Sequence, residues 1–367
     1  MLKDQASHRA IINLDLRKVP KFFIFAMTKS DKDIKKLTIV LPTYNARKSI
    51  TRAVDSVLNL LNDSELSTEL IVIDDYSDDD TFEIINKNYS AFSNIYIYKN
   101  AKNEGPGKTR NSALEKISSG YVGFIDSDDQ LNPTTYKKAF LDGLIKNADL
   151  ITFDVATIMP TKSILRYDYD RVGGDKFNLV RNCIKGDLDG SVIFSIYKKS
   201  MLDNFRIKFS SNYYEDIVFN YSAIMSSDSI HVAKEICYKK YCTPKSILNS
   251  ISEKHIDGMI DASILVRDFA IRNGYSTYKE FKSDFDYCLS GYIASLVIDI
   301  LKHEKSIDRS ISLLKYLHQK LERCFRMGNI ATRVDTKKDR LSNFFINNFD
   351  TSRLNITIGR LKELIEL

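Results

Sequence analysis

Short apolar runs alternate with amphipathic segments from Lys36 onward, and this alternation defines the first part of the chain. The apolar runs predict four strands, and three of the intervening segments carry the helical spacing of apolar residues. Repeated strand–helix units of this length predict an α/β fold with a mostly parallel sheet flanked by helices. The predicted strands are Leu37–Leu41, Glu69–Ile73, Ile95–Tyr98 and Tyr121–Ile125, and the predicted helices are Ala46–Leu61, Thr81–Ser90 and Lys108–Ser118.

The pattern divides the chain into three parts. Residues 1–36 form a charged N-terminal extension, residues 37–240 carry the strand–helix units, and residues 241–367 form a helical C-terminal domain. In this last part the strand signals vanish, and helical spacing with charged faces takes over. The helices predicted there are Ile256–Asn273, Tyr278–His303, Ile307–Phe325 and Leu354–Leu367.

Composition narrows the class of protein. With 43% hydrophobic residues among 367, the chain can bury a core. Its formal net charge of +6 is equally consistent with an anionic partner, an anionic membrane surface or simple solubility. Five scattered cysteines without a CxxC pair favour a reducing cytoplasm over a disulfide framework. The longest N-terminal apolar stretch, Val19–Met27, is too short to span a bilayer, so we expect neither a signal peptide nor a membrane span.

Acidic residues directly follow the fourth predicted strand. Asp126 and Asp128 flank Ser127, and alternate side chains of an extended turn point the same way, so the two carboxylates can converge on one cation. Such an oxygen-only environment suits Mg²⁺ or Mn²⁺ together with the phosphate oxygens of a ligand. The alternative is a solvated turn whose aspartates cap a helix that begins near Pro133.

A glycine-rich loop precedes the third predicted helix. Gly105 to Thr109 reads GPGKT and resembles the phosphate-binding loop GxxxxGK[ST], but the first glycine of that motif would fall on Lys102. A phosphate site is still consistent with the loop, because Lys108 and Arg110 bring positive charge near a helix N-terminus. A tight turn followed by a solvated basic helix face explains the same residues.

Two adjacent acids, Glu215 and Asp216, lie between aromatic and apolar residues. A carboxylate in partly apolar surroundings has a raised pKa and becomes a usable general base near neutral pH. In the alternative interpretation, the two acids begin an amphipathic helix and complement its dipole.

Taken in order, five segments resemble the inverting glycosyltransferase family 2, whose GT-A fold is Rossmann-like. The resemblance covers about residues 37–245, and the helices beyond have only a general likeness to those of capsule and teichoic-acid transferases. The segments are Val40–Asn45 (VLPTYN), Ile71–Asp79 (IVIDDYSDD), Asn103–Asn111 (NEGPGKTRN), Gly120–Asp129 (GYVGFIDSDD) and Glu215–Asp216.

The resemblance implies a role for each matching residue. Asp216 would be the general base, and Asp126 and Asp128 would hold the metal, Mn²⁺ or Mg²⁺, with Asp128 the more direct ligand. The implied nucleotide-sugar-binding residues are Pro42, Tyr44, Asp75, Lys108, Arg110, Asn111, Asp126 and Ser127.

The implied reaction is the metal-dependent transfer of a sugar from a UDP-sugar donor to a hydroxyl of a glycan acceptor, with inversion. The acceptor would be a cell-surface glycan of capsule, teichoic-acid or lipopolysaccharide type, either anionic or lipid-linked. No nucleic-acid partner is expected, and no oligomeric state is predicted. The expected location is the cytoplasm, with peripheral contact at the inner face of the membrane.

One segment departs from the family pattern. After the base motif, residues 241–247 keep a proline and a serine but lack the arginines of many relatives, and Lys240 and Lys245 are the candidates to replace them. Two other functions stay open at this point: a P-loop-like nucleoside triphosphatase, and a non-catalytic protein that binds a nucleotide sugar or a glycan.

Overall fold

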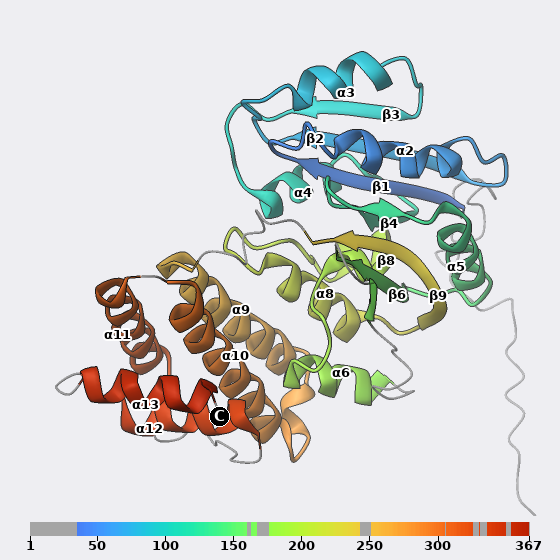
Figure 1. Ribbon diagram of the computed structural model, residues 1–367. Coiled ribbons are helices and arrows are strands. Elements are labelled where there is room, and N and C mark those ends of the chain that lie inside the picture. The colour runs from blue at the N-terminus through green and yellow to red at the C-terminus, as the bar shows by residue number, and fades with distance from the viewer. Residues whose placement is uncertain are drawn as a thin grey trace, which may run out of the picture.

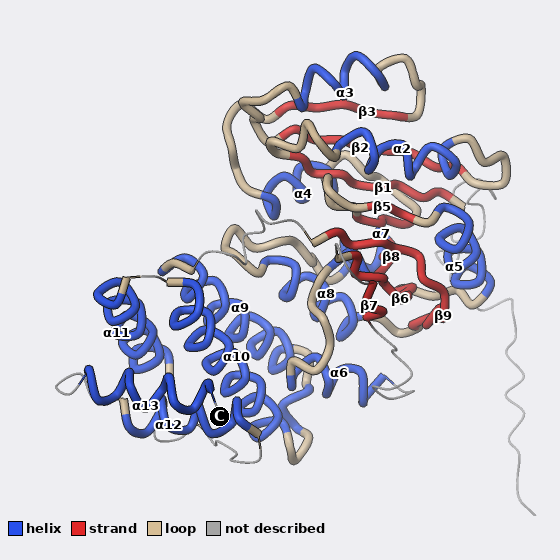
Figure 2. Tube along the Cα trace, viewed as in Figure 1, coloured by secondary structure: helices blue, strands red, loops and turns tan. Residues whose placement is uncertain are grey.

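A computed structural model describes residues 35–159, 163–166, 176–242, 251–304, 306–325, 330, 336–349 and 354–366. These residues form a nine-stranded sheet with helices packed on it, followed by a group of C-terminal helices (Figures 1 and 2). The α/β fold with a helical C-terminal region is therefore confirmed. The predicted N-terminal extension lies outside the described residues, apart from Lys35 and Lys36.

The first half of the sheet is parallel, as the apolar runs predict. β1 (Lys36–Thr43) lies between β2 (Ser67–Asp74) and β4 (Tyr121–Phe124), and β3 (Ile95–Lys99) pairs with β2 at the sheet edge. The interior of β1 is buried on both faces because helices cover both sides of the sheet. These helices are α2 (Ile50–Leu61), α3 (Thr81–Tyr89), α4 (Pro106–Leu114) and α5 (Pro133–Ile145).

Two predicted helix starts are wrong by a few residues. α2 begins at Ile50 rather than Ala46, because the amide of Ala46 donates to Thr81 Oγ1 (2.8 Å) and ties the preceding turn to the neighbouring loop. α4 begins at Pro106 rather than Lys108, since the first helical position leaves its amide unsatisfied and proline has no amide hydrogen to lose.

The second half of the sheet is mixed, which the local pattern does not predict. β8 (Ser195–Lys198) pairs antiparallel with β4 and with β6 (Leu150–Ile158), and β9 (Ile230–Tyr241) runs parallel to β6. The short strands β5 (Gln130–Leu131) and β7 (Ser163–Arg166) pair antiparallel with β9 and β6. The strand order is β3-β2-β1-β4-β8-β6-β9-β5, with β7 beside β6.

Three helices cross between the later strands: α6 (Lys176–Lys185), α7 (Lys199–Asn204) and α8 (Glu215–Ser226). After β9 the described chain is helical, and the predicted C-terminal helices are found within three residues of their predicted ends. One helix, α12, was not predicted, because its sequence KKDRLSNFFINN is largely polar. No helix among the described residues is both long and apolar enough to cross a membrane. The C-terminal helices are α9 (Glu253–Arg272), α10 (Phe281–His303), α11 (Ile307–Cys324), α12 (Lys337–Asn348) and α13 (Leu354–Glu366).

Two buried cores lie on the two faces of the sheet. One packs α2 and α5 against β1, with Leu37 and Ile39 fully buried. The other contains Phe124 of β4 together with α8 and residues of all five C-terminal helices. In it, the Phe124 ring lies edge-on to Phe209 and Phe219, with centroids 5.4 and 5.7 Å apart. The C-terminal helices therefore share one continuous core with the sheet.

Candidate active site

The candidate site lies where β1, β2 and β4 end and where α8 begins. The arrowheads of β1 and β3 point to the same side of the sheet (Figure 1), as parallel pairing through β2 requires. In sheets of this kind, ligands bind in the crevice beyond the carboxyl ends of the strands. Four of the residues predicted for ligand binding follow these strand ends, namely Tyr44, Asp75, Asp126 and Ser127. Pro42 lies within β1, and the other three lie on α4.

The loops after β1 and β2 are locked together and expose two aromatic rings. The amide of Asn45 donates to Ser77 Oγ (2.9 Å), and the amide of Asp78 donates to Asn45 Oδ1 (3.0 Å). Asn45 and Tyr76 adopt left-handed backbone conformations, with φ of 51° and 66°, that turn the chain after each strand. Tyr44 and Tyr76 are 48% and 53% exposed, so flat surfaces suited to a nucleoside base are accessible.

Asp75 follows β2, and its buried carboxylate organises the glycine-rich loop. Oδ1 accepts from Asn100 Nδ2 (2.7 Å) and from the amide of Glu104 (2.9 Å), and Oδ2 accepts from the amide of Gly105 (2.7 Å). These loop amides point at a carboxylate of the protein, so they do not form the phosphate cradle that a P-loop requires. Among the described residues Oδ2 accepts this one hydrogen bond, so a second acceptor position is open there. Contact of Asp75, and of half-buried Pro42, with a nucleoside stays a prediction.

Arg110 joins the acids after β4 to those that begin α8. Its guanidinium is buried 5.4 Å from the centroid of Phe209. Nη2 donates to Asp126 Oδ1 and Nη1 donates to Glu215 Oε1, both at 2.8 Å. Burial by itself lowers the pKa of Arg110, but the charges of Asp126, Glu215 and Asp216 outweigh it and raise this pKa. Arg110 thus holds two acidic motifs side by side that are far apart in the sequence.

The other two residues predicted on α4 lie in different settings. Lys108 is exposed on the helix surface. Asn111 instead donates to the carbonyl of Phe209 and accepts from its amide, both at 2.9 Å. The Asn111 side chain therefore anchors the segment that leads toward α8. A ligand contact of either residue stays a prediction.

The turn after β4 contains one acid with a structural role. Asp129 is buried, and its carboxylate accepts from the Tyr238 hydroxyl (2.8 Å) and from the amide of Tyr241 (2.7 Å). The same Tyr238 hydroxyl accepts from the amide of Asp126 (3.0 Å), so β9 fixes both ends of the turn. Burial, and then the charges of Asp126 and Asp128, raise the pKa of Asp129 to about 8.

Asp126, Ser127 and Asp128 lie partly exposed in this turn. Burial, followed by the charge of Asp126, raises the pKa of Asp128, while Lys240 and Arg52 lower it. Burial lowers the pKa of Lys240, but the carboxylates around it, with Asp126 first, raise that pKa overall. The turn is therefore crowded with negative charge that one lysine and two arginines offset only in part.

The two partly exposed aspartates fit a divalent cation. Asp126 and Asp128 repel each other, and a cation between or beside them would relieve the repulsion that raises the pKa of Asp128. Within the described residues, no group of three or more His, Cys, Asp or Glu side chains is placed to hold a metal ion. A metal at Asp126 and Asp128 would therefore need ligands from a bound diphosphate and from water, as Mg²⁺ commonly does.

Asp216 lies partly buried in the first turn of α8. Its neighbour Glu215 is held by Arg110, and within the described part of the chain the Asp216 carboxylate accepts from the amide of Ile217 (3.0 Å). Burial raises its pKa to about 7, with further upward contributions from Glu215 and Asp189 and an opposing one from Arg110. Asp216 is thus a carboxylate poised to exchange a proton near neutral pH.

Two residues of the site were not found from the sequence. Tyr76 presents an exposed ring beside the loop of Tyr44, and its only signal is its place after the paired aspartates of β2. The charge of Asp189 raises the pKa of both Asp216 and Lys240, although Asp189 lies in a loop without any recognisable motif. Lys240, considered above only as a replacement for missing arginines, is surrounded by the carboxylates of the site.

Sequence comparison relates the part of the chain that carries Asp75, Arg110 and Asp126 to a known family. Residues 38–206 match the family described as Glycosyl transferase family 2. The chain is 29% identical over 209 residues to the poly(ribitol-phosphate) β-N-acetylglucosaminyltransferase TarP of Staphylococcus aureus, a match that covers 56% of this chain and 62% of TarP. It is 37% identical over 110 residues to TarS of the same organism, covering 29% of this chain and 19% of TarS. The matches thus span less than two thirds of either relative.

Structural comparison extends the likeness beyond the matched domain. The crystal structure of S. aureus TarS 1-349 superposes with a TM-score of 0.61 at 18% identity, covering 90% of this chain and 91% of that one. A complex of the same protein with UDP-GlcNAc gives a TM-score of 0.59. At this identity the likeness establishes the fold alone, which confirms the GT-A architecture with its C-terminal helical region.

Proposed function

We propose that this protein, which carries a glycosyltransferase family 2 domain at residues 38–206, is an inverting, metal-dependent glycosyltransferase. Its donor would be a UDP-sugar, and its acceptor a hydroxyl of an anionic or lipid-linked cell-surface glycan. The observation that carries the proposal is the grouping of Asp216, Glu215, Arg110 and Asp126 at the strand ends. It places a carboxylate with a pKa of about 7 beside the acids suited to a cation.

Asp216 supplies the proton chemistry in this proposal. Its carboxylate accepts the proton of the acceptor hydroxyl as that oxygen attacks the anomeric carbon, and the bond to the nucleotide diphosphate breaks on the opposite face. One displacement of this kind inverts the anomeric configuration. Glu215 is less available for the task, because it is buried and its Oε1 already accepts from Arg110 in a 2.8 Å ion pair. Arg110 thereby leaves Asp216 as the available base.

The acids after β4 supply the donor side. Asp128 and Asp126 would hold Mn²⁺ or Mg²⁺, which when bound neutralises charge on the departing diphosphate. Lys240 adds a permanent positive charge, since neighbouring carboxylates keep its pKa raised. Tyr44 and Tyr76 would stack on the uracil, and the open acceptor position of Asp75 would receive its ring N–H.

The relatives supply the substrate class. TarP and TarS are named poly(ribitol-phosphate) β-N-acetylglucosaminyltransferases, and a Bacillus spizizenii relative is named a poly(ribitol-phosphate) β-glucosyltransferase. We therefore propose UDP-N-acetylglucosamine and UDP-glucose as the first donors to test, with a polyol-phosphate chain as acceptor. We place the reaction in the cytoplasm at the inner face of the membrane, where such glycans are assembled on lipid carriers.

A thermal-shift panel with a turnover assay tests the proposal. UDP or a UDP-sugar together with Mn²⁺ should raise the melting temperature. The nucleotide without Mn²⁺, or Mn²⁺ without the nucleotide, should raise it less. ATP with Mg²⁺ should have no comparable effect, because the glycine-rich loop directs its amides at Asp75. Release of UDP that depends on an added glycan acceptor would establish transfer. Binding of UDP with Mn²⁺ but no turnover on any glycan would instead favour a non-catalytic binding protein.

A further inference from the structure

A second cavity lies among the helices, away from the strand ends. It has a volume of about 420 Å³ and is bounded by the end of α6, the middle of α10 and the start of α12. Three of the residues that line it are lysines, two are tyrosines and one is a serine. These are Lys185, Lys337, Lys338, Tyr287, Tyr292 and Ser295.

The lining of this pocket is cationic once its own ion pairs are counted. Lys185 pairs with Asp187 (2.8 Å), which cancels one charge of each sign. Asp339 accepts from the amide and the hydroxyl of Thr336 (3.0 and 2.8 Å) in the cap of α12, and its charge leaves the three lysines and two aspartates of the lining with a net charge of +1. Lys337 and Lys338 are exposed at the rim. Two ammonium groups beside tyrosine rings and a serine hydroxyl suit an anionic sugar or polyol unit.

Gly291 forms part of the pocket wall in the middle of α10. A Cβ added there would meet nothing within 4 Å, so no steric contact requires glycine at this position. Glycine inside a helix costs about 1 kcal/mol relative to alanine. Its effect at Gly291 is to leave space that any larger side chain would occupy. The pocket is therefore open because of a residue that otherwise weakens its helix.

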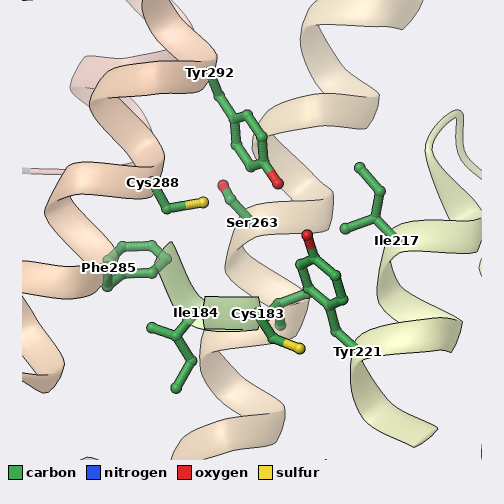
Figure 3. Close-up of a pocket in the computed structure, with 9 residues that line it drawn as sticks. Cys183, Ile184, Ile217, Tyr221, Ser263, Phe285, Cys288 and Tyr292 are labelled. Atoms are coloured by element: carbon green, nitrogen blue, oxygen red, sulfur yellow. The ribbon is translucent and has the colours of Figure 1, made fainter. Parts of the chain in front are cut away.

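Shared wall residues and sequence proximity link this pocket to the proposed base. Cys288 and Tyr292 line it and also line a small neighbouring cavity, whose other wall includes Ile217, the residue after Asp216 (Figure 3). In that cavity the Tyr292 and Tyr221 hydroxyls point toward each other (Figure 3). The pocket residue Asp187 also precedes Asp189, whose charge acts on Asp216, by two positions.

We propose that this pocket holds an anionic group, a phosphate or carboxylate, of the acceptor glycan while a neighbouring unit of the same chain reaches Asp216. The inference rests on the proposed function and specifies its acceptor: a polymer with regularly spaced negative charge. A pocket set apart from the base suits such a chain, because one repeat can be held while another reacts.

Direct binding to the full chain tests the inference without relying on turnover. The probes are labelled oligomers of ribitol phosphate, a uronic-acid oligosaccharide and a neutral glucose oligomer. The double variant Lys337→Gln/Lys338→Gln should bind the anionic oligomers roughly tenfold more weakly, the loss expected for two exposed ion pairs. The matched control Arg340→Gln/Lys362→Gln removes the same charge from exposed residues outside the pocket and should stay within about twofold.

A second pair of variants tests the space rather than the charge. Gly291→Ala should raise the melting temperature and keep binding, because alanine favours the helix and fills little of the pocket. Gly291→Phe should weaken binding of the anionic oligomers and raise the KM for an anionic acceptor roughly tenfold. Its KM for the UDP-sugar should stay within twofold, provided that circular dichroism matches that of Gly291→Ala.

The outcomes separate the two proposals. Equal loss in the pocket and control double variants would show non-specific charge attraction and overturn the inference. Preferential binding of anionic vesicles over the oligomers at the same lysines would overturn it too, in favour of a lipid headgroup. Transfer to anionic acceptors with an unchanged KM in all pocket variants would overturn the proposal for the pocket and leave the proposed transferase function standing. Oligomer binding that depends on the pocket residues, without any turnover of a UDP-sugar, would overturn the proposed transferase function and leave the binding pocket standing.

Discussion

Two acidic loops at the same edge of the sheet resemble each other in sequence and differ in structure. At the end of β2, Asp74 is fully buried and accepts from the amide of Ser77 (3.0 Å), while the next residue, Asp75, accepts from three donors of the loop between β3 and α4. After β4, Asp126 and Asp128 are partly exposed, and their mutual repulsion contributes to the raised pKa of Asp128.

The difference shows which acids build the site and which act in it. A carboxylate that accepts several hydrogen bonds from its own chain satisfies buried donors and shapes a loop. A carboxylate that is crowded by like charges gains most from a bound cation or a transferred proton. Asp126, Asp128 and Asp216 belong to the second group, and Asp74 and Asp75 belong to the first. Asp129 is intermediate, because it accepts two hydrogen bonds from β9 while the charges of Asp126 and Asp128 raise its pKa.

The largest effect is expected from Asp216→Asn. The amide cannot accept the acceptor proton, so turnover should fall by about 10²–10⁴-fold. UDP affinity, measured by calorimetry, should stay within a few-fold because Asp216 lies on α8 and not in the β4 turn. Turnover equal to that of the parent protein would remove Asp216 from its proposed role.

The second-largest loss of turnover is expected from Asp128→Asn. Turnover at low Mn²⁺ should drop at least about tenfold, and part of the loss should return at high Mn²⁺, as expected when a metal ligand is weakened. Stability should hold or rise, since the change removes a carboxylate whose pKa is raised by burial and by Asp126. Asp80→Asn, at an exposed acid of the other loop, is the control. Identical metal titrations for both variants would place the metal elsewhere.

The pH profile offers a smaller and sharper test. Because the pKa of Asp216 is raised to about 7, its active deprotonated form is lost as the pH falls through 7, and kcat/KM should decline about tenfold per unit below it. Glu215, Asp189 and Asp126 raise this pKa, while Arg110 lowers it. Asp189→Asn should therefore move the acid limb to lower pH. A limb that does not move would show that another group titrates.

The smallest effect on turnover is expected from the loop-building acids. Asp74→Ala leaves the buried amide of Ser77 without its acceptor, at a cost of about 1–3 kcal/mol in the free energy of unfolding. Urea denaturation would measure this loss, and kcat at saturating donor should change by less than about threefold. If Asp74→Ala lost turnover without losing stability, Asp74 would act in the reaction, and the distinction between structural and reactive acids would be wrong.

The sequence predicted the parallel half of the fold well, because each of its elements has a local signal. The runs at Leu37–Leu41 and Tyr121–Ile125 are apolar on both faces, as strands covered by helices must be. β8 and β5 have no such signal. Their places depend on pairing with β4 and β9, which lie far away along the chain. Local periodicity carries no information about such partners.

The same limit applies to the site. Asp126, Asp128 and Asp216 could be predicted, since each stands in a motif beside an apolar run. The Arg110 bridge could not, because its two partners come from the turn after β4 and from α8, which are far apart in the sequence. Asp129 shows the converse error. It reads as one more acid of the cluster, but Tyr238 turns it into a buried structural group.

Tyr238 also bears on the order in which the protein assembles. Its hydroxyl accepts from the amide of Asp126 and donates to the carboxylate of Asp129, and both residues lie more than one hundred positions before Tyr238 in the chain. Contacts of such long sequence separation form late, since the intervening chain has to be brought together first. In a partly folded molecule, the parallel strands would therefore form before the hydrogen bonds of Tyr238. If Asp126 and Asp128 hold a metal and a nucleotide as proposed, that site would be completed only once β9 has docked.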